Sequence, residues 1–225
     1  MNSIFRKSML SVAGLVMSGG VIAGPVLAAH AASADATPAA SAGTPATSAD
    51  ATPATTATAA GAIADYQYQA QPNGYYCGPA STRIALSAEG MQVSQDKLAS
   101  ELGTTLNGTD SAFDITRVLN DHTGGKYKTT EIQDNVATQA QIDQLRADVK
   151  TAVDQGRPVV ANILGTALDV DGVAHSYTGH YLTVVKYKDD GNTVLIADPA
   201  SPGEPTYWMN VTDLANWIAS RGYSS

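Results

Sequence analysis

The composition of the chain changes near Tyr66, and this change limits what can fold. Residues 32–65 are almost entirely Ala, Thr, Ser, Pro, Gly and Asp, and the segment Ser33–Ala39 recurs as Ser48–Ala54. A segment without large apolar side chains buries too little surface to offset the entropy lost on ordering. We therefore predict a disordered spacer over residues 32–65 and one globular domain over residues 66–225, which is an ordinary domain length.

The first 31 residues have the organisation of an export signal. Arg6 and Lys7 precede an apolar, small-residue-rich stretch from Met9 to Gly24, and small residues suited to cleavage follow, ending at Ala28 or Ala31. The apolar stretch is shorter than a membrane-spanning helix. We expect a secretory signal peptide over residues 1–31, a secreted and soluble mature protein, and no membrane span.

The charge balance argues against some partners. The net charge is −8, and loss of residues 1–31 would remove only Arg6 and Lys7, which makes it −10. Like charges repel, so nucleic acids and anionic lipid surfaces are poor partners for such a protein. We expect no nucleic-acid partner.

Within residues 66–225, helical patterns come first and strand patterns follow. Helices are expected over residues 78–89, after Ser94, from Ser111 and after Thr138. The last of these is the clearest, because Ile142, Leu145, Val149 and Val153 share one helical face. Strands are expected over residues 157–164, 180–188, 193–198 and 205–209, with a closing helix over residues 212–220. This order predicts an α+β fold with an antiparallel sheet.

The one cysteine of the chain, Cys77, stands directly before Gly78, Pro79 and Ala80, at the expected start of a helix. Proline is favoured in a first helical turn, where its missing N–H has no intrahelical acceptor. The free N–H groups and the positive end of the helix dipole stabilise a thiolate. The position therefore favours a nucleophilic cysteine over a small buried apolar residue.

A cysteine nucleophile needs a base, and the base needs an acceptor that orients it. His30 precedes the domain, His122 follows a helix, and His175 lies in a polar stretch that we interpret as a loop. His180 opens an apolar strand and is the best candidate for the base.

Whether Asp198 can be the partner of His180 depends on the hairpin that joins their two strands. If Asp189-Asp190-Gly191 form a three-residue turn with a bulge at Gly191, Lys188 pairs with Asn192 and His180 lies on the same face as Asp198. A two-residue turn would place the two side chains on opposite faces. The pair therefore requires this bulge or an equivalent one elsewhere in the hairpin.

Gln71, six residues before Cys77, carries a side-chain amide that could help the Cys77 N–H to stabilise an oxyanion. The sequence resembles the C39 and C39-like cysteine peptidases of the papain-like fold. The resemblance is carried by Gln71, the segment Cys77-Gly-Pro-Ala, the strand that begins at His180, and Asp198-Pro199. The resemblance covers residues 68–225. It implies Cys77 as nucleophile, His180 as general base and acid, Asp198 as the orienting residue and Gln71 as oxyanion donor.

Transporter-fused members of this family cut leader peptides after a Gly-Gly pair, but this chain has neither a membrane span nor a nucleotide-binding motif. The resemblance is closer to the free-standing, secreted branch. We therefore expect a monomeric peptidase that acts on peptides or proteins without a cofactor or metal. Two alternatives remain open, a transpeptidase or amidase on peptide or cell-wall substrates and a catalytically degenerate peptide-binding domain. The tyrosines near these motifs, which either line a substrate cleft or pack at its rim, are Tyr66, Tyr68, Tyr75, Tyr76, Tyr177 and Tyr181.

Overall fold

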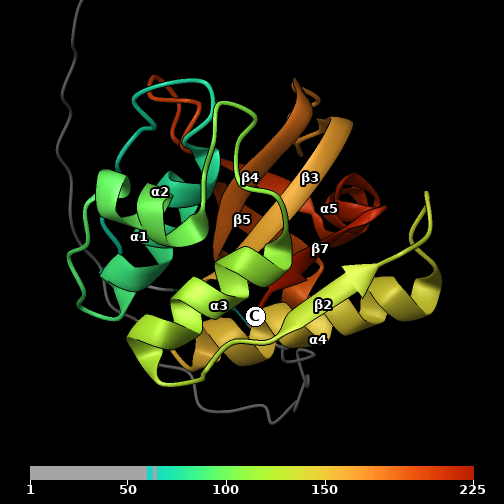
Figure 1. Cartoon of the computed structure of the whole chain (residues 1–225). Coiled ribbons are helices and arrows are strands. Elements are labelled where there is room, and N and C mark those ends of the chain that lie inside the picture. Colours follow the sequence, from blue (N-terminus) through green and yellow to red (C-terminus); the bar gives the residue numbers. More distant parts are fainter. Residues whose placement is uncertain (1–59, 63–64) are drawn as a thin grey trace, which may run out of the picture. The chain divides into compact units, whose positions relative to one another are not determined.

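The computed structural model describes residues 60–62 and 65–225 (Figure 1). The expected signal peptide and most of the expected spacer lie outside the described residues. The helices are α1 (Cys77–Ala88), α2 (Gln95–Leu102), α3 (Ala112–Thr123), α4 (Gln139–Asp154) and α5 (Val211–Ile218). The strands are β1 (Gly61–Ala62), β2 (Thr129–Ile132), β3 (Val159–Leu168), β4 (Ala174–Lys188), β5 (Thr193–Ala197), β6 (Thr206–Asn210) and β7 (Arg221–Ser224).

The strands form one antiparallel sheet in the order β2-β7-β3-β4-β5-β6, and β1 pairs with the end of β4. Figure 1 shows α1 and α2 on one side of β4 and β5, and α5 on the other side of these strands. Val160 and Ala161, which are consecutive in β3, belong to different apolar clusters, since neighbouring side chains of a strand point to opposite faces. Helices α1 to α3 contribute to one cluster, and α4 and α5 contribute to the other. The predicted α+β fold is confirmed.

Three helices begin at the polar residues that the sequence indicated. The side chains of Ser94, Ser111 and Thr138 accept hydrogen bonds from the backbone N–H three residues later. In α4, Gln141 also reaches back to the backbone of Thr138, which completes a capping box. These side chains satisfy N–H groups that have no partner inside the helix.

The strands differ from expectation mainly in length and number. β3 and β4 continue past the expected ends, so that His175 lies in β4 and our interpretation of this stretch as a loop was wrong. Strands β2 and β7 were not expected, and they pair with each other although almost a hundred residues separate them. Within the expected spacer, Gly61–Ala62 pair with Lys186 and Tyr187 of β4.

The turn between β4 and β5 also differs from expectation. Lys188 pairs with Thr193 instead of Asn192. The reason is that Asp189, Asp190 and Gly191 all adopt positive φ angles (54°, 56° and 84°), and Asp is among the residues that tolerate this conformation. The register shifts farther along the hairpin, between Val184 and Lys186.

This shift is a β-bulge at Val185, and it has the effect that we assigned to Gly191. Beyond it, Val184 pairs with Ile196 and Thr183 with Ala197. The extra residue on β4 shifts the pairing of the two strands by one position. His180 and Asp198 therefore lie on the same face of the sheet.

Candidate active site

Cys77 is the first residue of α1 and is only 7% exposed. Tyr76, which precedes it, provides no side-chain cap, so the helix start offers its N–H groups to other acceptors. The backbone N–H groups of Gly78 and of Tyr181 in β4 lower the pKa of the Cys77 thiol. The helix start therefore supplies the electropositive surroundings that a thiolate needs.

Gly78 allows the opposite wall of the site to approach α1. A Cβ atom at this position would overlap Thr109 Oγ1 and lie 2.9 Å from Thr109 Cβ. Thr109 belongs to the loop between α2 and α3, and its hydroxyl is held by Thr104 Oγ1 at 2.7 Å. Glycine is therefore required at position 78 on steric grounds, because any larger residue would displace the loop that carries Thr109.

His180 and Asp198 form a buried pair. His180 Nε2 lies 2.7 Å from Asp198 Oδ1, with side-chain exposures of 3% and 0%. Since Nε2 contacts the carboxylate, Nδ1 is the ring nitrogen left for Cys77, which lines the same cleft as His180. The structure therefore brings together three of the four residues that the sequence singled out.

A second bulge in β4 aligns Tyr177 with His180. Ile163 pairs with His180 and Gly165 pairs with Tyr177, so Thr178 and Gly179 of β4 face the single residue Leu164 of β3. Without the bulge, residues 177 and 180 would point to opposite faces. With it, their rings stack, with centroids 4.0 Å apart and planes at 18°.

Asp198 accepts four hydrogen bonds on its carboxylate. His180 and the N–H of Ala200 share Oδ1, and the hydroxyls of Tyr177 and Tyr207 donate to Oδ2 at 2.9 Å each. The backbone carbonyl of the same residue accepts from Tyr68. A charge that is removed from water remains ionised only when it is satisfied in this way.

The pKa values of the three groups move toward a thiolate–imidazolium pair. Burial raises the pKa of Cys77, but the hydrogen bond and positive charge of His180 and the two backbone N–H groups hold it below its usual value. Burial lowers the pKa of His180, but Asp198 and Cys77 raise it to about 9. Burial raises the pKa of Asp198, yet His180 and the other donors leave it lowered. Proton transfer from the thiol to the imidazole is therefore favoured.

Gln71 is near this group through its backbone, because its N–H donates to the carbonyl of Pro199 at 3.0 Å. Its side-chain Nε2 donates to the carbonyl of Asn73 at 2.7 Å. An amide nitrogen carries two hydrogens, so one of them is not used by this bond. The role of Gln71 as an oxyanion donor stays a prediction.

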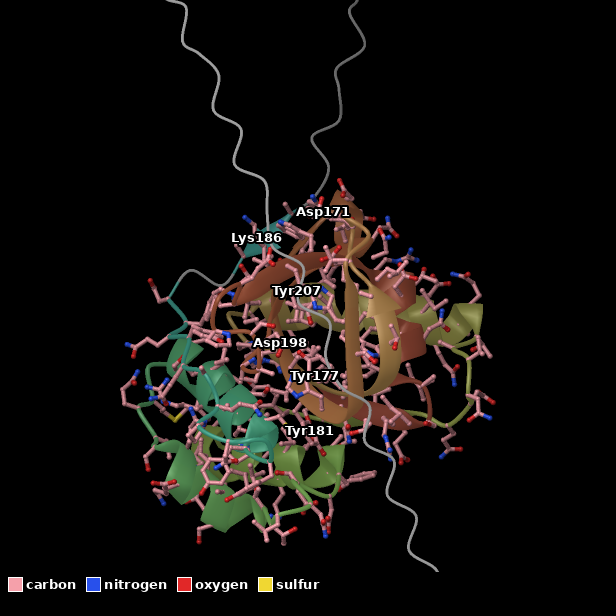
Figure 2. All side chains as sticks on the ribbon, turned by 90° about the horizontal axis from the view of Figure 1, so that it is seen from above. Asp171, Tyr177, Tyr181, Lys186, Asp198 and Tyr207 are labelled. Carbon is pink, nitrogen blue, oxygen red and sulfur yellow. The ribbon has the colours of Figure 1, made fainter. Side chains whose placement is uncertain are left out.

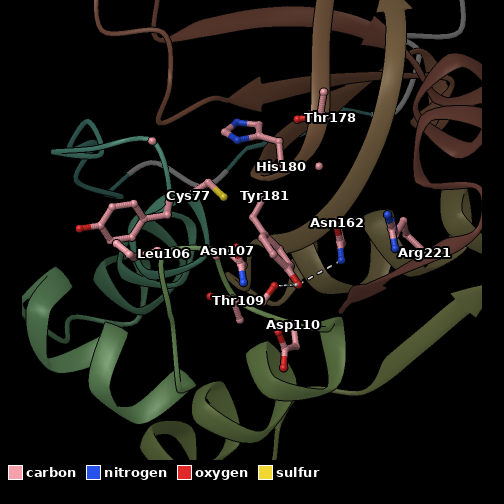
Figure 3. A pocket seen from close by; sticks show the side chains of 14 residues that line it. Cys77, Leu106, Asn107, Thr109, Asp110, Asn162, Thr178, His180, Tyr181 and Arg221 are labelled. Atoms are coloured by element: carbon pink, nitrogen blue, oxygen red, sulfur yellow. Dashed lines mark hydrogen bonds between the residues drawn. The ribbon is translucent and has the colours of Figure 1, made fainter. Parts of the chain in front are cut away.

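A cleft of about 320 Å³ opens beside Cys77 and His180 (Figure 3). Its floor contains Asn162, whose Nδ2 donates to the hydroxyl of Tyr181, which in turn donates to the carbonyl of Thr109. Charged groups at its rim belong to Asp110 and Arg221. Leu106, at the tip of the turn between Thr105 and Gly108, is 81% exposed and also lines the cleft.

The remaining described histidines have carboxylate partners of their own. His122 Nε2 lies 2.8 Å from Glu101 at the surface between α2 and α3. His175 Nε2 lies 3.0 Å from Asp169 in a partly buried position. No described residues form a cluster of three or more His, Cys, Asp or Glu suited to a metal ion. Over the same part of the chain, no helix has the length and apolar character required to span a membrane.

Sequence reasoning missed Tyr207 and the way in which Tyr177 acts. Tyr177 was expected to line a cleft or to pack at its rim, but it stacks on the base and donates to its carboxylate partner. Tyr207 lies in an expected strand, and only the pairing of Ile196 with Tyr207 shows that β6 lies beside β5 next to Asp198. One signal was available in the sequence. Tyr207 lies in the expected strand that follows Asp198-Pro199, close enough along the chain to reach Asp198.

Comparisons with known proteins identify a family and a fold. The sequence model described as the Peptidase_C39 like family matches residues 63–225. A protein from Bacillus anthracis described as a C39-like peptidase has a solved structure with a TM-score of 0.51 and 16% identity, over 74% of this chain and 96% of that chain. The peptidase domain of Streptococcus ComA, a bifunctional ABC transporter, has a TM-score of 0.47 and 19% identity over 70% and 96% of the two chains. No curated protein matches the chain.

Proposed function

The chain belongs to the Peptidase_C39 like family, and we propose that it is a secreted cysteine peptidase that hydrolyses peptide bonds through an acyl-enzyme on Cys77. The observation that carries the proposal is that Cys77 and His180 line one cleft and that His180 is hydrogen-bonded to Asp198. A nucleophile, a base and an orienting carboxylate in contact are the arrangement that acyl transfer requires.

In the first half-reaction, the Cys77 thiolate attacks the carbonyl carbon of the scissile peptide bond. The C–N bond breaks, and the His180 imidazolium gives its Nδ1 proton to the departing amine. A thioester between Cys77 and the acyl half of the substrate remains. Asp198 holds the imidazole through Nε2 and stabilises its charged form.

In the second half-reaction, neutral His180 removes a proton from water, and the hydroxide attacks the thioester carbonyl. The C–S bond breaks, a carboxylic acid leaves, and the thiolate–imidazolium pair is restored. Both half-reactions place negative charge on the carbonyl oxygen. The N–H of Cys77 at the start of α1 and the unused Nε2 hydrogen of Gln71 are the proposed donors to this oxyanion.

The cleft suits an extended polypeptide rather than a small cofactor. It is lined by polar backbone and side-chain groups, with Asn162 at its floor and Asp110 and Arg221 at its rim. Exposed Leu106 adds an apolar contact above it. We therefore propose a peptide or protein substrate, bound by a monomer without a cofactor.

Secretion is part of the proposal and rests on the signal-like residues 1–31. Expression of the full chain in a secreting bacterial host, followed by N-terminal sequencing of the protein in the medium, tests it. A new N-terminus after Ala28 or Ala31 supports secretion through this signal, and retention of uncleaved protein in the cell contradicts it.

The peptidase activity is tested with an unbiased peptide library whose products are read by mass spectrometry. Wild-type protein should cleave internal peptide bonds, and Cys77→Ser should not, although its circular dichroism and melting temperature stay close to those of the wild type. Cleavage of the same bonds by Cys77→Ser would overturn the proposal.

The same library separates the alternatives. Products that carry an added amine in place of water would indicate a transpeptidase. A wild-type protein that binds peptides, cleaves none and keeps its affinity in His180→Ala would indicate a binding domain.

A further inference from the structure

The structure contains a second His–Asp pair, partly buried, next to the one that includes Asp198. His175 Nε2 lies 3.0 Å from Asp169 Oδ2, with side-chain exposures of 12% and 6%. Asp169 Oδ1 accepts the backbone N–H groups of Asp171 and Val173 at 2.9 Å each. The carboxylate is thus fixed by the β3–β4 turn, and it fixes the orientation of the imidazole.

This pair contacts the residues around Asp198 through Tyr207. The rings of His175 and Tyr207 are stacked, with centroids 3.8 Å apart and planes at 13°. The Tyr207 hydroxyl donates to Asp198 Oδ2. Figure 2 labels Tyr207, Asp198 and Tyr177 near one another in the middle of the view. Contacts therefore run without interruption from Asp169 through His175 and Tyr207 to Asp198 and His180.

We propose that His175 and Asp169 are positioning residues that hold the Tyr207 ring, so that its hydroxyl fixes the Asp198 carboxylate and, through it, the catalytic orientation of His180. This inference rests on the proposed function of Cys77, His180 and Asp198. It gives the second pair a role that acts through Tyr207 and involves no contact with the substrate.

The chemistry of the pair supports this role over simple core filling. Taking a His and an Asp out of water costs free energy that apolar side chains of similar volume would not cost. In return, the His175 ring has a fixed orientation against Tyr207, because it is hydrogen-bonded to a carboxylate that is itself held in place. Tyr207 needs that orientation, because its hydroxyl and that of Tyr177 share one oxygen of Asp198. With both in place, the other oxygen is left to His180 and Ala200.

The test uses two single variants and their combination. Tyr207→Phe keeps the ring and removes the hydroxyl, and His175→Ala removes the stacked ring. Each should lower kcat for peptide cleavage about three- to tenfold, which is the value of one buried hydrogen bond, with KM nearly unchanged. In the Tyr207→Phe background, His175→Ala should have little further effect on kcat, because the route to Asp198 is already interrupted.

Two more variants separate positioning from stability. Tyr187→Phe also removes a buried tyrosine hydroxyl from a carboxylate, Asp154 at 2.8 Å, but at the other end of β4. It should lower the melting temperature as Tyr207→Phe does and leave kcat unchanged. His175→Phe keeps a ring against Tyr207 but loses the bond to Asp169, so it should recover only a minor part of the kcat lost in His175→Ala. Full recovery would contradict a role for Asp169.

A readout without a peptide substrate keeps the two proposals distinguishable. The alkylation of Cys77 by iodoacetamide is followed against pH. In His175→Ala, the midpoint of the profile should rise toward that of an ordinary thiol, because a less fixed His180 stabilises the thiolate less.

If wild-type Cys77 already has an ordinary profile, the proposed function fails. If the wild-type midpoint is low and His175→Ala and Tyr207→Phe leave both kcat and the midpoint unchanged, the inference alone is overturned. Independent, multiplicative effects in the double variant would also contradict it. Should His175→Ala not fold, Tyr207→Phe and its comparison with Tyr187→Phe still decide the outcome.

Discussion

The stability of the His180–Asp198 pair should depend on pH in a way that Asp198→Asn removes. His180 is almost fully buried, and its pKa is raised from the ordinary 6.5 to about 9. Below pH 6.5 the folded and unfolded states both carry the proton, and the stabilising contribution is fully present. As the pH rises through about 9, the folded state loses the proton and the contribution disappears.

The magnitude follows from the two pKa values. Their difference, at about 1.4 kcal/mol for each tenfold change in proton affinity, corresponds to about 3 kcal/mol. Both Asp198 and Cys77 contribute to the rise, and the Asp198 hydrogen bond is the larger of the two. We therefore assign the larger share, about 2 kcal/mol of the free energy of unfolding, to the hydrogen bond and the charge of Asp198 together.

The assay is urea unfolding at pH values from 6 to 9.5, in a Cys77→Ser background. Serine does not ionise in this range, so the titration of the thiol is removed from the comparison. Cys77→Ser should lose about 2 kcal/mol more stability across this range than Cys77→Ser with Asp198→Asn. All other titrating groups are common to both proteins. Parallel curves with the same pH dependence would refute the assignment.

Three further substitutions have defined outcomes. Gly78→Ala should lower the melting temperature and the cleavage rate, because its Cβ would overlap the Thr109 hydroxyl. Gly203→Ala, which has open space around it, should change neither. Equal effects of the two substitutions would contradict the steric argument. Tyr177→Ala should reduce kcat more than Tyr177→Phe, because the phenyl ring retains the stacking on His180. Steady-state kinetics of the two variants test this. Equal losses of kcat would argue against a role for the stacked ring. Leu106→Ala should raise KM severalfold and leave the melting temperature within about 1 °C, since this residue is 81% exposed. An unchanged KM would exclude a substrate contact.

Much of the site could be predicted because local sequence rules specify it. Cys77 lies at a helix start because Pro79 favours a first turn, and the helix begins there. The strand order that brings Asp198 beside His180 follows from two apolar segments joined by a short polar turn. These features depend on neighbours in the sequence, so they are visible in it.

The remaining features depend on contacts between distant segments. His180 shares a face with Asp198 because of the bulge at Val185, and with Tyr177 because of the bulge at Thr178–Gly179. Nothing in the apolar pattern marks either bulge. The polar, glycine-containing stretch around His175 is typical of a loop, but pairing with β3 makes it a strand. Strand β7, with the sequence Arg-Gly-Tyr-Ser, has no clear alternation and is stabilised by β2 and β3. Tertiary pairing outweighed local propensity at each of these positions.

The central claim is that Cys77 is a nucleophile activated by His180, and the pH profile of its alkylation in the wild-type protein tests this claim most directly. Iodoacetamide reacts with the thiolate, so the rate at each pH reports the ionised fraction. The lowered pKa of Cys77 predicts rapid labelling of this residue below pH 7, with a marked loss of rate in His180→Ala. A profile with a midpoint near 8.5, as for an ordinary thiol, in both proteins would contradict the claim.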